Sequence, residues 1–198
     1  YYINVFCASS SSHTILHNDA PKLYRFIQAS DIFEYKLKLK ENYISIKGYS
    51  ENSLIKQKGE IIYTSRMTNK IRATLNNDNN IIGGKVNVLF SINKSITNRF
   101  ILMLINSRLI NFWYREKYNI QHMQGGALPI NTTELTLIPM PNIPENQKSY
   151  DNIVNKILNY KYEDKDTYTL EQEIDNLVYR LYELTYIEVR VIDPEFSL

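Results

Sequence analysis

The sequence predicts an α+β fold in which a mixed β-sheet occupies the N-terminal half and bracing helices follow it. In the first half, apolar and polar residues alternate with period two, which is typical of half-buried strands. In the second half, apolar residues recur at intervals of three and four, the period of an amphipathic helix. The chain has 198 residues, of which 43% are hydrophobic, and it can therefore bury a substantial core.

Five segments of the first half are predicted to be strands. Between residues 31 and 40, Phe33, Tyr35 and Leu37 alternate with lysines. The other four predicted strands cover residues 43–47, 60–66, 70–75 and 85–92. Residues 76–84 are rich in asparagine and end on two glycines, so we expect a turn there.

Four helices are predicted in the second half. The strongest begins at a Thr97 cap and runs for about five turns with its apolar residues on one face. Prolines between residues 129 and 144 force extended backbone after it. A second helix is predicted over residues 145–159, and capping-box patterns begin a third at Thr169 and a short fourth at Thr185.

The number of cysteines and the hydropathy of the chain indicate where in the cell the protein is expected. Cys7 is the single cysteine, so no internal disulfide can form and a cytoplasmic location is expected. With His13 and His17 it is one ligand short of a structural zinc site, so we expect no metal. No apolar run approaches the roughly 18 to 20 residues of a membrane span, and the start at Tyr1 without a signal pattern indicates a fragment of a longer chain.

The charges are sorted along the chain, although the net charge is only +2. Residues 61–117 hold nine basic and two acidic side chains, a balance of +7, whereas residues 163–195 hold ten acidic and three basic ones, a balance of −7. Such segregation suits a protein that lays one face on a polyanion. An unevenly charged surface that only contacts solvent is the alternative.

Three blocks of sequence resemble a known family. They are GEIIY to KIRATL over residues 59–75, LINSRLINFWY over 104–114 with LIPMP at 137–141, and LEQEIDNLVYRLYELT over 170–185. In this order they are similar to the C-terminal specificity (target-recognition) domain of TaqI-like adenine methyltransferases and Type IIG restriction-modification enzymes. Glu183 stands where that family often has glycine.

The resemblance implies a non-catalytic domain that recognises a DNA sequence and positions a DNA adenine methyltransferase or endonuclease on it. Its partners would be double-stranded DNA and the catalytic domains of the parent chain. No cofactor is expected in this chain, since S-adenosylmethionine and magnesium would act in those domains. We divide the chain into an unplaced, β-rich part at 1–58, a recognition core at 59–144 and a helical lobe at 145–198.

Two kinds of side chain are candidate DNA contacts on this interpretation. Arginine and lysine neutralise phosphates, whereas amide, guanidinium and imidazole groups on loops can read base edges. The candidates are Arg66, Lys70, Arg72 and Lys85 in the basic region, Asn76, Asn77, Asn79 and Asn80 in the predicted turn, and Gln121, His122 and Gln124 in a glycine-ended loop. Solvent exposure alone is the alternative for each. By contrast, Asn106 and Ser107 lie inside an apolar helix and are expected to bond backbone groups.

Two other functions remain open at this point. One is a protein-docking module of a restriction-modification complex, in which the acidic helices bind another subunit. The other is half of a Type I specificity subunit, which would carry a long coiled-coil spacer, but the sequence has no sustained heptads. No motif of a methyltransferase catalytic site, such as an Asn-Pro-Pro-Tyr-like loop, is present in the chain.

Overall fold

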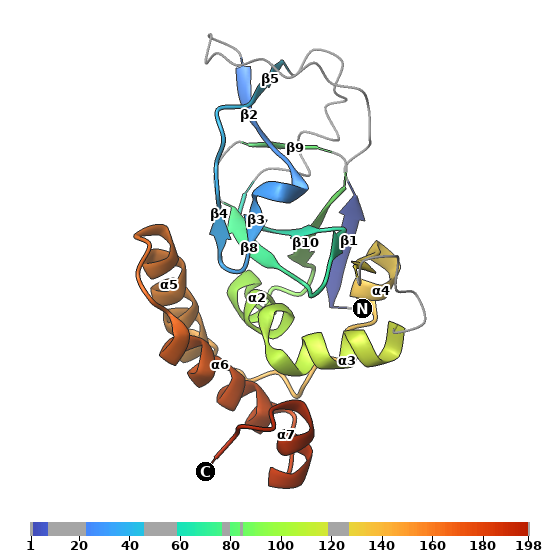
Figure 1. Cartoon of the computed structure of the whole chain (residues 1–198), viewed down its shortest axis with the longest axis vertical. Coiled ribbons are helices and arrows are strands. Elements are labelled where there is room, and N and C mark those ends of the chain that lie inside the picture. The colour runs from blue at the N-terminus through green and yellow to red at the C-terminus, as the bar shows by residue number, and fades with distance from the viewer. Residues whose placement is uncertain are drawn as a thin grey trace.

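The fold places its strands in the first half of the chain and most of its helices in the second, as an α+β architecture requires. The computed structural model describes residues 2–7, 23–45, 59–76, 80–83, 85–118 and 127–197. Figure 1 shows the strands in the upper part of the molecule, with α2 and α3 below them and α5 to α7 running down to the C-terminus.

A four-stranded antiparallel sheet forms the centre, in the order β1 (Ile3–Cys7), β10 (Val86–Ser91), β6 (Ile61–Ser65) and β8 (Ala73–Asn76). All residues of β6 are buried, because each face of this strand has its own cover. Ile62 packs into a large apolar cluster with residues of α2 (Asn98–Asn106), whereas Tyr63 packs into a second cluster with Ile27 and Ile32. The N-terminal segment therefore contributes both a strand and core residues to the same unit.

Shorter strands surround this sheet. β2 (Leu23–Ile27) pairs antiparallel with β5 (Tyr43–Ser45) and parallel with β9 (Ile81–Ile82). β7 (Met67–Thr68) pairs with β11 (Leu128–Pro129). After a 3-10 turn, η1 (Ala29–Asp31), the strands β3 (Ile32–Phe33) and β4 (Lys36–Leu37) form a tight hairpin.

The prediction of one continuous strand over residues 31–40 is wrong, because the chain turns at Glu34 and Tyr35. Tyr35 has a φ of 57° and only 4% of its surface is exposed. Its backbone N–H donates to the Ala73 carbonyl at 2.9 Å. Packing of Tyr35 against β8 thus overrides the alternating pattern, as tertiary context often does for strand propensity.

The predicted five-turn helix is two helices, α2 and α3 (Arg108–Tyr118), separated by Ser107. Ser107 is buried and extended, with a ψ of 153°. Its hydroxyl donates to the Leu104 carbonyl at 2.7 Å and accepts from the Ile110 N–H at 3.3 Å, so it serves the end of one helix and the start of the next. The cap at Thr97 is confirmed, since its hydroxyl accepts the backbone N–H three residues later at 3.0 Å.

The C-terminal lobe comprises α5 (Lys148–Tyr162), α6 (Tyr168–Leu181) and α7 (Tyr186–Ile192), preceded by the short α4 (Thr132–Thr136). α5 contacts α2, and α6 contacts both α3 and α5. α6 begins after Thr167 rather than at the predicted Thr169, whereas the capping box at Thr185 is confirmed. None of the described helices is long and apolar enough to cross a membrane.

Glu183 ends α6 in a left-handed backbone conformation. Its φ is 55°, and the N–H of the following residue, Leu184, donates back to the Tyr179 carbonyl at 3.0 Å. This is the hydrogen bond of a helix ending in which glycine is the preferred residue, because a side chain is strained at such a φ.

An arginine at the start of α3 connects α3 to α6 and to the end of α7. The Arg108 guanidinium lies 3.1 Å from Asp175 on α6 and 2.6 Å from Asp193 after α7. Burial raises the pKa of Asp175 to about 6, although the backbone N–H and the charge of Arg108 lower it. Asp175 therefore holds a proton more readily in the fold than in the unfolded chain.

Candidate nucleic-acid interface

Four of the predicted cations come together at one end of the central sheet. β6 ends next to the starts of β8 and β10, because Thr64 pairs with Ala73 and Ser65 pairs with Val86. The cations flank these three strand ends, with Arg66 after β6, Lys70 and Arg72 before β8, and Lys85 before β10. The backbone N–H of Arg66 donates to the Lys85 carbonyl at 3.0 Å. Residues that lie up to 19 positions apart in the sequence thus share one edge.

The strand that follows the predicted base-reading loop, β11, lies at the same edge. β11 pairs with β7, placing Leu128 opposite Thr68, and the N–H of Ile130 donates to the Arg66 carbonyl at 2.7 Å. The chain enters β11 from residues 119–126, which hold Gln121, His122 and Gln124. These three candidates lie outside the described residues, but the strand that follows them pairs with β7, which follows Arg66 in the sequence.

The cations of this edge have weak partners or exposed ones. Lys70 pairs with Glu34 at 2.7 Å, and its side chain is 47% exposed. Arg72 donates to the side chain of Asn69 at 3.3 Å, and Arg66 lies 3.6 Å from the sulfur of Cys7. Exposed ion pairs contribute only about 0 to 1 kcal/mol, so a phosphate can replace such a partner at little cost.

The asparagines of the predicted turn lie elsewhere. Asn76 is the last residue of β8, not a loop residue, and it pairs with Ile61 at the end of the sheet opposite to Arg72. Its side chain is buried, donates to the Tyr63 hydroxyl at 3.2 Å and accepts from Asn80 at 2.8 Å. Asn80 is also buried. These two amides therefore form an internal network, whereas Asn77 and Asn79 lie outside the described residues.

Two asparagines from the helices fix the backbone on both sides of Arg72. The Asn106 side chain accepts from the Ala73 N–H and donates to the Ala73 carbonyl, both at 2.9 Å. The Asn111 side chain accepts from the Ile71 N–H at 2.7 Å. The expected backbone role of Asn106 is thus confirmed, and the two amides hold the segment that carries Arg72 against α2 and α3.

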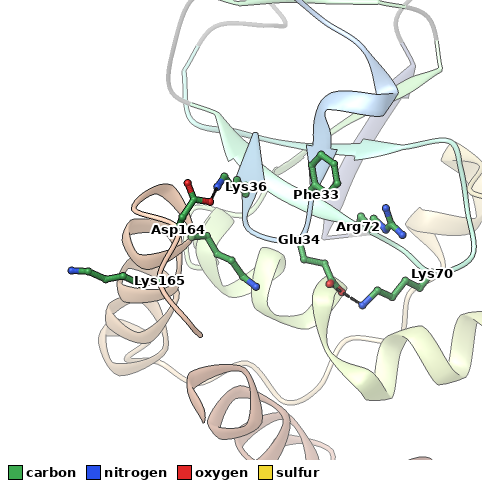
Figure 2. A pocket seen from close by; sticks show the side chains of 8 residues that line it. Phe33, Glu34, Lys36, Lys70, Arg72, Asp164 and Lys165 are labelled. Atoms are coloured by element: carbon green, nitrogen blue, oxygen red, sulfur yellow. Dashed lines mark hydrogen bonds and ion pairs between the residues drawn. The ribbon is translucent and has the colours of Figure 1, made fainter. Parts of the chain in front are cut away.

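A cation-rich pocket adjoins Lys70 and Arg72. Its volume is about 540 Å³, and it opens between the β3–β4 hairpin, the segment before β8 and the end of α5 (Figure 2). The lining residues are Phe33, Glu34, Lys36, Lys70, Arg72, Lys161, Asp164 and Lys165. Sequence reasoning missed four of these site residues, Phe33, Lys36, Lys161 and Lys165. Lys36 fitted a strand face, Lys161 borders the acidic segment 163–195, and Lys165 lies inside it.

The carboxylates of this pocket hold two of its lysines. Lys36 lies 2.5 Å from Asp164, and Glu34 reaches Lys70 from the hairpin turn (Figure 2). The hydrogen bond and charge of Lys36 hold the pKa of Asp164 below its ordinary value, so Asp164 is charged at neutral pH. Among the residues that the structure describes, no group of three His, Cys, Asp or Glu side chains is placed to hold a metal ion.

A comparison with protein families identifies this architecture. The family described as the TaqI-like C-terminal specificity domain matches residues 24–140, more than half of the chain. The chain belongs to this family. A search of curated proteins found no match. The TaqI-like specificity domain is a non-catalytic DNA-recognition domain of restriction-modification enzymes, so the resemblance seen in the sequence is confirmed.

The matched span of the specificity domain includes β2 to β11 and the helices α2, α3 and α4. It therefore contains the strand-end cations and the two clamping asparagines. The helices α5, α6 and α7 follow after the end of the match at residue 140. The cation-rich pocket is lined from both sides of that boundary.

Proposed function

We propose that this specificity domain reads a short sequence in double-stranded DNA and positions the catalytic domains of a restriction-modification enzyme on it. The catalytic partner would be an adenine methyltransferase or an endonuclease of the same parent chain, in the cytoplasm. S-adenosylmethionine and magnesium would act in those partner domains. The observation that carries the proposal is the convergence of four cations and the flank of a polar loop at one sheet edge, in a chain of this family.

The two sets of residues would have different roles in the complex. Arg66, Lys70, Arg72 and Lys85 would contact phosphates and fix the register of the domain on the duplex. Gln121, His122 and Gln124 would approach base edges in the major groove, where a glutamine amide can pair with adenine. Asn77 and Asn79 would make a separate contact, because Asn76, which precedes them in the sequence, lies at the end of β8 opposite to Arg72.

Selection from random DNA tests this function. The chain is incubated with a pool of random duplexes at two salt concentrations, and the retained DNA is sequenced. Enrichment of a short motif, with retention falling steeply as salt rises, is the expected result because each phosphate contact releases counterions. Retention without a motif would contradict sequence reading by this domain, and no retention at either salt would contradict DNA binding.

An exposed apolar face on α7 favours a second candidate function, docking to another protein domain. Ile187 and Val191 are 76% and 63% exposed and lie four residues apart, so they share one face of the helix. Glu183 and Glu188 place negative charge close by in the sequence, and both are exposed. This face would suit a basic-rimmed apolar surface on the catalytic domain. A chain that retains no DNA but binds such a domain would support docking as the main function.

A further inference from the structure

The cation-rich pocket combines residues from distant parts of the chain. Lys36 comes from β4, Arg72 from the segment before β8 and Lys161 from the last turn of α5. With Lys70 and Lys165 they make five cations. Two carboxylates, Glu34 and Asp164, line the pocket, and two more, Glu171 and Glu163, pair with Lys161 and Lys165 from outside it. The pocket therefore has an excess of positive charge, which attracts an anion.

Arg72 is the side chain of the pocket best prepared for an anion. In the part of the chain that the structure describes, no carboxylate lies within ion-pairing distance of its guanidinium, whose recorded partner is the amide of Asn69 at 3.3 Å. The bonds of Asn106 and Asn111 to the residues on either side of Arg72 hold its backbone in place. A guanidinium on fixed backbone can bind a phosphate with two parallel hydrogen bonds at low entropic cost.

Carboxylates hold the lysines of the pocket, and one of these carboxylates, Asp164, is exposed. Asp164, which binds Lys36, has a side chain that is 86% exposed. Lys161 lies 2.7 Å from Glu171, whose side chain is 32% exposed. Because a pair with an exposed carboxylate contributes little, an incoming phosphate can displace Asp164 from Lys36, whereas at Lys161 it has to compete with the half-buried Glu171. Figure 2 shows the Lys165 side chain directed away from the other labelled groups, so we give it no direct role.

The pocket also has the size and the apolar surface that a nucleotide needs. Its volume of about 540 Å³ is within the usual range of small-ligand sites. Phe33 is 39% exposed at the end of β3 and lines the same wall as Lys36. Its ring can cover the apolar face of a deoxyribose while the cations hold the adjoining phosphate.

We propose that this pocket binds the phosphate backbone of the DNA, through Arg72, Lys36 and Lys161, and that Asp164 competes with a phosphate for Lys36. The inference rests on the proposed DNA-binding function and extends it. In this proposal the helical lobe, which lies beyond the family match, contacts the DNA directly through Lys161. Lys70 and Arg72 belong both to the strand-end edge and to the pocket, so the two surfaces are continuous.

Two substitutions in the full chain, each with a matched control, test this pocket. Lys161→Gln removes a pocket cation, and Lys156→Gln removes an exposed cation of the same helix that does not line the pocket. Asp164→Asn removes the competing carboxylate, and Glu173→Gln removes an exposed carboxylate of α6 outside the pocket. Asp164 has a φ of 55°, a conformation that asparagine tolerates well, so this variant keeps the backbone.

The readout is the affinity for a selected duplex, measured by fluorescence anisotropy across a salt series, with thermal unfolding of each variant as the folding check. Lys161→Gln should weaken binding about three- to tenfold and lower the slope of log K against log salt by about 0.9, the value of one phosphate contact. Asp164→Asn should tighten binding by roughly threefold at low salt, whereas each control should change it by less than about twofold.

These measurements distinguish a wrong assignment of the pocket from an absence of DNA binding. If the unmodified chain binds DNA with sequence preference but each variant matches its control, the pocket is not a phosphate site and the function stands. If the unmodified chain binds no DNA at either salt, both proposals are overturned.

Discussion

Replacing Asn106 with alanine removes the clamp that holds β8 against α2. The Ala73 N–H loses its partner in a site where Ala73 is fully buried, while the Ala73 carbonyl keeps its bond from Tyr35. An unsatisfied buried donor costs about 1 to 3 kcal/mol, and the second lost bond adds about 1 kcal/mol. We therefore expect Asn106→Ala to lower the free energy of unfolding by about 2 to 4 kcal/mol.

Urea unfolding of the two proteins measures this difference. Asn152→Ala is the matched control, because Asn152 is an exposed residue inside α5 and alanine is a better helix former there. The control should keep or slightly increase the stability. Asn106→Ala should also weaken DNA binding, since the backbone beside Arg72 is released. A decrease of the free energy of unfolding by less than about 0.5 kcal/mol would refute the claim that Asn106 holds β8 against α2.

Three further expectations follow from single side chains. Glu183→Gly should stabilise the chain by about 1 kcal/mol because the backbone there is left-handed, and a lower midpoint of thermal unfolding would contradict this. The raised pKa of Asp175 means that its contribution to stability is full below its unfolded pKa and is lost as pH rises through about 6. The free energy of unfolding, measured in urea, should therefore fall more between acidic and neutral pH in the unmodified chain than in Asp175→Asn. An equal fall in the two proteins would refute this role of Asp175. Arg66→Ala and Lys70→Ala should each weaken binding and lower the salt slope by about 0.9, whereas Gln124→Ala should relax the preferred sequence without changing the slope. An unchanged slope for Arg66→Ala or Lys70→Ala would remove that residue from the interface.

Local signals in the sequence predicted those parts of the fold that local chemistry decides. The caps at Thr97 and Thr185 depend on side chains that bond the backbone three residues away, and both are confirmed. The break at Ser107 was missed because the apolar period continues from α2 into α3 across a serine that bonds on both sides. The turn at Tyr35 was missed because its cause is a contact with β8, which no local pattern contains.

The candidate interface was predicted in part. The charge balance indicated the basic region 61–117, and the structure brings Arg66, Arg72 and Lys85 of this region to one edge of the central sheet. The sequence did not indicate that Lys36 and Lys161 share a pocket, since they lie 125 positions apart and each has a structural explanation in its own segment. Nor did it indicate that Asn76 is buried, because strand and turn patterns overlap at the end of β8.

Sequence reading by this domain is tested most directly by one comparison of affinities. The chain is titrated against its selected duplex and against duplexes that each carry a single base-pair substitution, all at one salt concentration. The account predicts that substitutions within the site weaken binding by about 1 to 3 kcal/mol each, while substitutions in the flanks have no effect. Equal affinity for every duplex would contradict it, because the cations of the edge would then bind DNA without reading it.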